Sequence, residues 1–207
     1  MILNAFPKNL TVVEAAESRR SIRKYTSDEI PESHVDEILR IASLAPSPWN
    51  LQPWRVFAVR DRETKLRLQE AAFGQSQVGD CQVLFVVSTD MHDALNNIGE
   101  IVHPDMVGER REKEIATISG YFAQFDRTTQ ENWARQIGYI FVGYLLLAVQ
   151  SLGYSSSPML GFVPDKVKEI LGLDAHVEIP ALLAVGVAAE AGFPHHRHPL
   201  ERFVKKI

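Results

Sequence analysis

The sequence predicts an α+β protein in which helices surround a small sheet and one helix is central. Two continuous apolar runs, 82–89 and 177–189, are typical of strands that are buried on both faces. The segment 31–45 has the period of an amphipathic helix, and the segment 132–154 predicts a long helix that is apolar nearly all round. Such a helix has to be buried on more than one side, which places it at the centre.

Shorter patterns predict the remaining elements in order along the chain. A helix is expected over 9–21 before a burst of cations, and a strand over 54–60. Pro31 suits the first turn of its helix, Asp61 can cap the next one at 61–72, and Gly172 lies near the end of a short helix at 163–173. The apolar face of the 31–45 helix is formed by Val35, Ile38, Leu39 and Ala42.

Residues 1–207 are expected to form a single domain, because no repeat, low-complexity tract or linker divides the chain. The polar segment at about 91–130 predicts an excursion with one or two exposed helices. A chain of this length does not easily bury a helix that is apolar on all faces. We therefore expect an obligate homodimer with the long helix at or near its interface; burial inside one subunit is the alternative.

Composition excludes several classes of protein. The formal net charge of −4 gives no bulk attraction to nucleic acid or to an anionic membrane. The longest apolar run, "YIFVGYLLLAV", is too short to span a bilayer, and the N-terminus lacks the order of a signal peptide. A cytoplasmic location is therefore expected. The single cysteine, Cys81, lies in an apolar run and is expected to be a buried small hydrophobe.

Common catalytic motifs are absent from the sequence. It contains no phosphate-binding Walker loop, no GxGxxG after a strand, no GxSxG and no HExxH or paired CxxC. What remains is two basic clusters, one at each end of the chain, whose arginine and serine side chains could together hold one phosphate. The alternative is that both are solvated surface charges. The clusters are Arg19, Arg20, Ser21 and Arg23, and His195, His196, Arg197 and His198.

The stretch 45–57, "APSPWNLQPWRVF", carries two indoles and two amides in a connection, where a polar surface loop is the usual expectation. Together with "RRSIRKY", "SLGYSSSPMLGF" and "HHRHPLE", it resembles the nitroreductase family of dimeric FMN-dependent NAD(P)H oxidoreductases. The four motifs stand in the family's order, and the resemblance covers most of the chain except 91–130, a segment that varies within the family. It implies a central, mostly antiparallel sheet with the long helix at the dimer interface.

The resemblance also implies which residues bind FMN at the subunit interface. Arg19 and Ser21, with Arg197, would bind the phosphate, and Arg23 would lie near the pyrimidine edge, where a cation stabilises the reduced ring. Asn50 would bond the polar edge of the ring, and Gln52 would hold the ribityl chain or brace the loop. The full implied set is Arg19, Arg20, Ser21, Arg23, Pro46, Ser47, Pro48, Asn50, Gln52, Gln75, Pro158, Met159, Leu160, Gly161, His195 and Arg197.

Four positions depart from the family's pattern. Leu160 replaces a frequent glutamate, although a backbone contact survives that change, and Gly161 suits a close approach of backbone to the ring. Pro48 removes an N–H donor after Ser47. His195 replaces a frequent lysine, so FMN is expected to bind more weakly as pH rises through neutrality. Gln75 stands near the position of a flavin-contacting asparagine.

The implied reaction is hydride transfer from NAD(P)H through flavin N5 to a nitroaromatic, quinone or similar electron-poor acceptor, with ping-pong kinetics and no separate catalytic residue. A flavin-binding protein without turnover, or a specialised dehalogenase or flavin-converting member, is the alternative.

No metal is expected, since the tail histidines are too close in sequence for an ordinary zinc site. The acceptor pocket is expected to involve Trp49, Tyr121, Phe122 and Phe125, with helix packing as the alternative for the last three.

Overall fold

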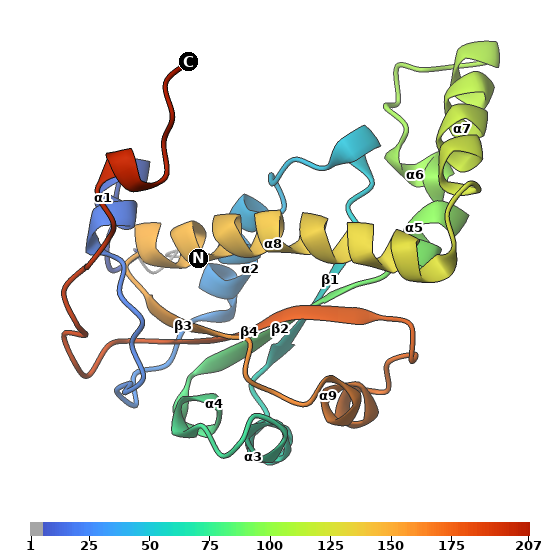
Figure 1. The fold of residues 1–207 in the computed structure, drawn as a ribbon. Coiled ribbons are helices and arrows are strands. Elements are labelled where there is room, and N and C mark those ends of the chain that lie inside the picture. The colour runs from blue at the N-terminus through green and yellow to red at the C-terminus, as the bar shows by residue number, and fades with distance from the viewer. Residues whose placement is uncertain (1–5) are drawn as a thin grey trace.

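The computed structural model describes residues 6–207, and its centre is a four-stranded sheet (Figure 1). The strands are β1 (Trp54–Val59), β2 (Val83–Thr89), β3 (Ser155–Met159) and β4 (Glu178–Gly186). Their order is β1-β2-β4-β3, and each neighbouring pair is antiparallel. The expected α+β fold with a small antiparallel sheet is confirmed. Only β3 was not singled out as a strand from the sequence.

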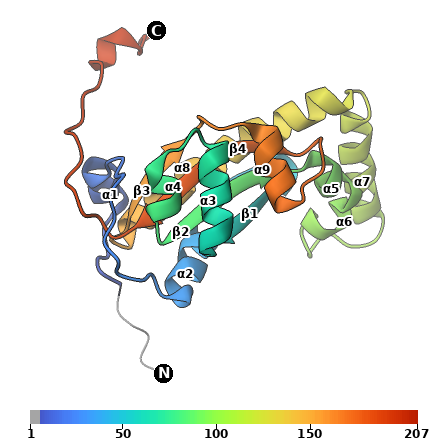
Figure 2. The same ribbon diagram turned by 90° about the horizontal axis from the view of Figure 1, so that it is seen from below.

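The two faces of the sheet carry separate hydrophobic cores, because successive side chains of a strand point to opposite faces. On one face, Phe85 of β2 packs with α2 (Glu32–Ala42) and α8 (Arg127–Ser151). On the other face, Val86 joins a second core. Every residue of β2 is buried, as the sequence predicts. Figure 2 shows the helices of the second core over the sheet: α3 (Arg62–Ala71), α4 (Ser76–Asp80) and α9 (Pro164–Leu171).

Local signals set the ends of the helices. Thr11 and Glu14 form a reciprocal capping box at the start of α1 (Val12–Ser18). Asp61 caps α3 by accepting a backbone N–H, as expected. Gly172 ends α9 in the left-handed conformation, with a φ of 67°.

The long helix α8 packs closely on β4. A Cβ added at Gly138 would lie 2.6 Å from Cγ of Pro180, so only glycine fits there. Pro180 stands where the register between β2 and β4 shifts, a position at which a sheet tolerates proline. Tyr139, Ile140 and Tyr144 are nevertheless 41–44% exposed. The expectation that this helix is buried on more than one side is therefore not met within one chain.

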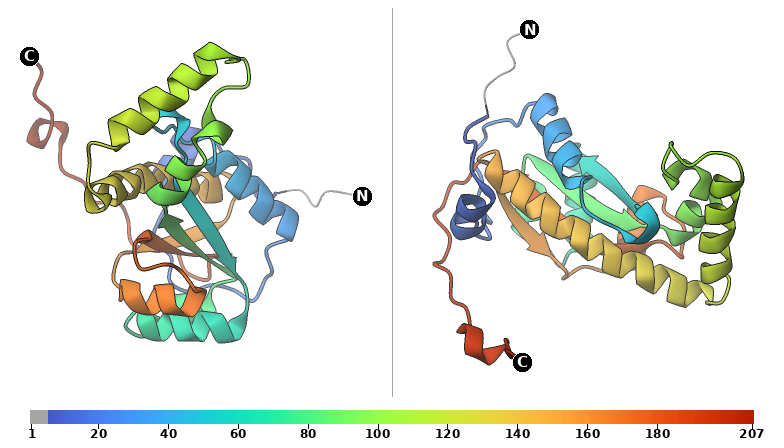
Figure 3. Two further views of the ribbon diagram at one scale, coloured as in Figure 1. Left: turned by 90° about the vertical axis from the view of Figure 1, so that its right-hand side faces the viewer. Right: turned by 90° about the horizontal axis from the view of Figure 1, so that it is seen from above.

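The segment between β2 and α8 forms three helices: α5 (Met91–Asn96), α6 (Ile98–Ile101) and α7 (Glu109–Phe122). We call residues 91–126 the excursion. In the left view of Figure 3, α7 projects away from the sheet. The expectation of one or two exposed helices is wrong, both in number and because Phe122 is buried in the core.

The tail beyond Glu190 leaves the body of the chain, as Figures 1 and 3 show. It contains one short 3₁₀ turn, η2 (Leu200–Arg202). Phe193 and Phe203 in this tail are largely exposed. Across residues 6–207, none of the helices has the length and apolar character needed to cross a membrane.

Candidate functional site

Basic side chains from the two ends of the chain meet where α1 ends. Nε2 of His195 lies 2.8 Å from Nη1 of Arg20 and 2.7 Å from the carbonyl oxygen of Arg19. One ring nitrogen cannot accept from the guanidinium and donate to the carbonyl at once, so the tautomer decides which contact is the hydrogen bond. Either way, the tail is held against the first basic cluster. The expected weakening of FMN binding with rising pH stays a prediction.

Arg19 is a half-buried cation without a countercharge. Its Nη1 is buried and has no hydrogen-bond partner. Burial lowers the pKa of its guanidinium, and the charges of Arg197 and Arg20 lower it further. Among residues 6–207, no carboxylate forms an ion pair with any of these three arginines. Mutually repelling guanidinium groups with a free N–H fit a phosphate, which would satisfy the donor and cancel the repulsion.

The segment that follows α1 is attached to the sheet through β3. Ser21 and Ser156 form an isolated parallel bridge, and the N–H of Ile22 donates to the Ser156 carbonyl at 3.0 Å. The hydroxyl of Ser156 is buried without a partner. The side chain of Arg23 is exposed, and its backbone N–H donates to Oε1 of Glu190. Orphaned polar atoms therefore stand on both segments that this bridge joins.

Tyr25 holds the same segment against β4. Its hydroxyl lies 2.6 Å from the carbonyl oxygen of Ile22 and 3.1 Å from that of Ala184, so it can donate to either. Its ring covers Gly186, where an added Cβ would lie 2.6 Å from a ring carbon. The glycine therefore allows the tyrosine to fix the position of the first basic cluster.

The predicted ring-facing segment, 158–161, leaves the end of β3 beside Gln75. Nε2 of Gln75 donates to the carbonyls of Gly161, at 2.8 Å, and Ala72, at 3.0 Å. Outside the helices and strands, the described residues show no hydrogen bond from the N–H of Leu160 or of Gly161. Leu160 is also exposed. Both N–H groups can therefore donate to a ligand, which stays a prediction, and Gln75 braces their loop.

Two details of this segment refine the expectation. The side chain of Met159 is buried, and its sulfur lies 3.4 Å from Nε2 of Gln77, so only its backbone could face a ligand. A Cβ at Gly161 would lie 3.6 Å from Nε2 of Gln75, which is ordinary contact. The chain itself does not demand glycine here, and a close approach of a bound ring to Gly161 stays a prediction.

The opening loop, residues 45–53, has an unusual backbone. Trp49, Asn50 and Gln52 have φ values of 49°, 59° and 43°, a region that residues other than glycine rarely adopt. Oγ of Ser47 accepts the Gln52 N–H, and Nε2 of Gln52 donates to the Asn50 carbonyl at 3.2 Å. Nδ2 of Asn50 donates to the Ile101 carbonyl of the excursion at 3.2 Å. Gln52 thus braces the loop, and the amide nitrogen of Asn50 is already used within the chain.

Trp49 joins the opening loop to a cluster of aromatic rings. Its ring centroid lies 5.0 Å from that of Tyr121 and 5.8 Å from that of Phe122, and Phe125 and Trp133 complete the cluster. Phe122 is 1% exposed, so it is a core residue and the expectation that it lines a substrate pocket is wrong. Tyr121 and Phe125 are half-buried in the same cluster.

A cavity of about 440 Å³ lies between the opening loop and the excursion. Trp49 and Asn50 line one side of it, and His103, Met106 and Glu114 line the other. Of the four aromatic residues expected at a substrate pocket, Trp49 is the one that lines this cavity. Pro46 and Pro48 are exposed on the neighbouring surface of the loop.

The predicted site residues thus fall into two groups. The cationic group contains the two basic clusters, the 158–161 segment and Gln75. The aromatic group contains the opening loop and the rings around Trp49. In Figure 1, α1 and β3 lie beside the C-terminal end of α8, whereas the excursion lies at its N-terminal end. Among residues 6–207, no hydrogen bond, ion pair or ring contact joins the two groups.

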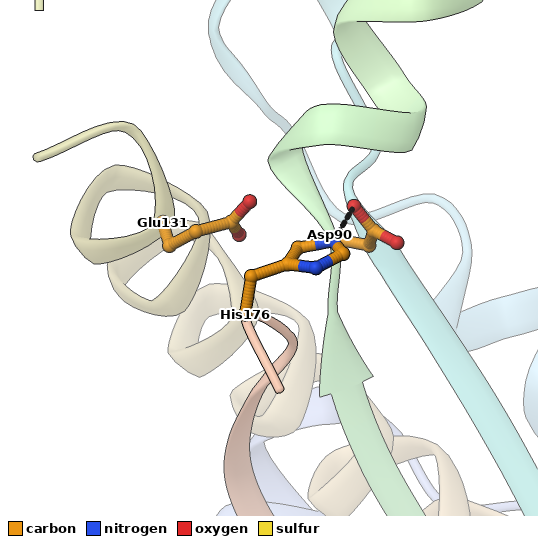
Figure 4. Close-up of side chains that lie close together, drawn as sticks. All are labelled: Asp90, Glu131 and His176. Atoms are coloured by element: carbon orange, nitrogen blue, oxygen red, sulfur yellow. Dashed lines mark hydrogen bonds and ion pairs between the residues drawn. The ribbon is translucent and has the colours of Figure 1, made fainter. Parts of the chain in front are cut away.

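Sequence reasoning missed a cluster at the base of the excursion. Asp90, Glu131 and His176 point toward one another in Figure 4, and Nε2 of His176 lies 3.2 Å from Oδ1 of Asp90. Burial raises the pKa of Glu131, which accepts the backbone N–H groups of Met91 and His92. No spacing in the sequence could have revealed these residues, since each comes from a different part of the chain.

The cationic group can bind a phosphate and offer backbone donors to a planar, polar-edged ring. A profile of the "Nitroreductase family" matches residues 16–187. A Thermus thermophilus protein named NADH dehydrogenase is 50% identical, over 92% of this chain and 93% of its own. YdgI of Bacillus subtilis, provisionally named an NAD(P)H nitroreductase, is 30% identical, over 91% and 94%.

Solved structures give the same result. An Exiguobacterium sibiricum protein, provisionally named a nitroreductase and solved in complex with FMN, superposes with a TM-score of 0.89 at 27% identity, over 98% of this chain and all (100%) of that one. A nitroreductase-like protein of Streptococcus mutans has a TM-score of 0.84 at 28% identity, over 94% and 97%. The profile match spans most of the described fold, including the sheet, α8 and the first basic cluster. The chain belongs to the nitroreductase family.

Proposed function

We propose that the protein is an FMN-dependent NAD(P)H oxidoreductase that reduces nitroaromatic, quinone or similar electron-poor compounds. The observation that carries this proposal is Arg19, a half-buried guanidinium with an orphaned N–H beside two further arginines. That arrangement supports the binding of a phosphate. The FMN in the related Exiguobacterium structure and the names of the relatives support FMN and NAD(P)H as the ligands.

Within this proposal the cationic group holds the cofactor. Arg19, Arg20 and Arg197 bind the phosphate together with Ser21, and His195 holds the tail against them. The exposed Arg23 approaches the pyrimidine edge of the ring, where a cation favours the reduced state. The N–H groups of Leu160 and Gly161 meet the ring's polar edge from the other side. Bound FMN would accept a hydride from NAD(P)H and pass electrons to the acceptor, which predicts ping-pong kinetics.

Within one chain the two groups lie at opposite ends of α8 (Figure 1). We propose a homodimer in which the cationic group of one chain faces the aromatic group of its partner. The exposed Tyr139, Ile140 and Tyr144 of α8 provide an apolar surface for that contact, and the tail, which leaves the body of the chain, offers the exposed Phe193 and Phe203 to a partner separately. The excursion then belongs to the same single domain as the sheet and shapes the acceptor side of the partner's site. Light scattering during size-exclusion chromatography should give a molar mass twice that of one chain.

A visible absorption spectrum of the purified protein under nitrogen tests the function. We expect a flavin spectrum that bleaches when NADH or NADPH is added and returns when a quinone follows. A flavin that neither donor bleaches would instead support a flavin-binding protein without turnover. If no flavin binds even when FMN is supplied, the proposed cofactor site is wrong.

A further inference from the structure

We propose that Asp90, Glu131 and His176 bind one divalent transition-metal ion that clamps the base of the excursion. Asp90 directly precedes α5, where the excursion begins, and Glu131 lies in the second turn of α8, just after the excursion ends. His176 comes from the connection before β4. A metal ion bound by all three would therefore fix both ends of the excursion to the sheet.

The three side chains are close enough to share an ion. One ligand atom from each lies within 4.8 Å of the others, and the nitrogen of His176 is already 3.2 Å from Asp90. In a tetrahedral site, bonds of about 2.1 Å would place ligand atoms about 3.4 Å apart. Small side-chain rotations toward the centre of the cluster in Figure 4 would close the remaining gap.

The electrostatics of the cluster favour a cation. Among residues 6–207, no lysine or arginine forms an ion pair with Asp90 or Glu131. Glu131 is 4% exposed, so water screens its charge poorly. Backbone N–H groups of α5 bond both carboxylates, yet each oxygen keeps a lone pair for a metal ion. Two carboxylates in this space need a positive charge, which either a proton or a metal ion can provide.

The donor set indicates the kind of metal. Imidazole nitrogen favours zinc and its transition-metal neighbours, whereas magnesium and calcium prefer all-oxygen sites. A cavity of about 250 Å³ adjoins the cluster and has room for a water molecule as fourth ligand. Besides Glu131 and His176 it is lined by Thr128, Asn132 and Ala175, and by Arg127 and Glu178, whose charges are of opposite sign. We therefore expect Zn²⁺, Co²⁺ or Mn²⁺ to bind in preference to Mg²⁺.

Calorimetry on the chelator-treated protein, titrated with zinc chloride, tests the site without reference to flavin chemistry. We expect one strong site per chain, weak or no binding of magnesium, and a rise of a few degrees in the unfolding temperature with zinc. His176→Gln keeps a hydrogen-bond donor for Asp90 but removes the imidazole, and should weaken zinc binding at least about tenfold. His198→Gln in the exposed tail is the matched control and should leave the strong site unchanged.

Two outcomes would overturn the proposal: no strong zinc site in the wild-type protein, or a strong site that His176→Gln leaves intact, whether or not His198→Gln removes it. In that case a proton supplies the charge, and the cluster is a set of hydrogen bonds that caps α5. If His176→Gln fails to fold, cobalt titration of the wild-type protein and of His198→Gln decides, because the cobalt band should appear in both. Four-coordinate cobalt absorbs visible light at longer wavelengths than flavin, and zinc should abolish that band. Absence of the band would refute the site.

Discussion

The cationic group and the aromatic group differ in how completely their polar side chains are hydrogen-bonded within the chain. In the cationic group, Arg19 keeps a buried polar atom without a partner, and so does Ser156, which forms a bridge with Ser21 of that group. In the aromatic group, Trp49 is packed against the excursion, and Asn50 and Gln52 use their amides inside the chain. Since buried polar groups are normally bonded, the first group indicates a ligand that the chain does not provide. The second group mainly packs the opening loop against the excursion, and its surface remains available to a ligand.

The largest expected effect is on folding stability, at the aromatic group. Phe122→Ala should lower the free energy of unfolding by about 3–5 kcal/mol, because it empties a fully buried site among four other rings. Urea denaturation at fixed protein concentration measures this. Leu66→Ala, on the exposed side of α3, is the control and should change stability by no more than about 0.5 kcal/mol. A small effect of Phe122→Ala would mean that the ring cluster does not stabilise the fold.

The cationic group should show the opposite pattern, with affinity lost and stability kept. Arg19→Gln removes a charge-assisted contact worth about 1.5–3 kcal/mol, so FMN should bind roughly tenfold to a hundredfold more weakly. Fluorescence titration of the flavin-free protein measures the affinity. Arg62→Gln, at the exposed start of α3, should not change it. Equal affinity in wild type and Arg19→Gln would mean that the orphaned guanidinium does not meet the phosphate.

Gly186→Ala tests whether the cationic group depends on packing outside its own residues. The new Cβ would meet the ring of Tyr25 and push the segment that carries Ser21 and Arg23 away from β4. We expect a loss of about 1–3 kcal/mol in stability together with weaker FMN binding. A variant that loses stability but binds FMN normally would show that Tyr25 does not position the cluster.

The smallest effect is expected at Cys81, which lies outside both groups. Burial raises the pKa of its thiol to about 11. Because the folded protein holds this proton more tightly than the unfolded chain, stability should be unaffected at neutral pH and fall progressively as pH rises from the ordinary thiol pKa toward 11. At neutral pH an alkylating reagent should react only after unfolding, which mass spectrometry can follow. Rapid labelling of the folded protein would contradict the burial.

The elements that the sequence predicted best are those that rest on local periodicity. The helix around Val35 and Ile38, the caps at Asp61 and Gly172 and the buried run of β2 are all as expected. Each depends on residues close together in sequence, where spacing alone fixes which side is buried. The polar segment 155–159 was not singled out because its serines lack the apolar content of a buried strand.

The features that sequence reasoning missed depend on contacts between distant residues. Nothing local distinguishes Phe122 from Phe125, yet one is buried and the other is half-exposed. The left-handed backbone of Trp49 and Asn50 is stabilised by partners in the excursion, which no pattern in the loop could reveal. Contact between Arg19 and the tail was expected from the family's motifs, but its orphaned N–H could be seen only in three dimensions.

The separation of the two groups along α8 has a consequence for mixtures of damaged chains. If two chains share each site, a chain with Arg19→Gln and one with a damaged opening loop spoil different halves of it. A mixed dimer would then contain one site with both defects and one with neither. Random pairing of the two chains in equal amounts would restore roughly a quarter of all sites. At an FMN concentration too low to load the damaged sites, the two preparations, unfolded and refolded together, would thus show activity that neither shows alone.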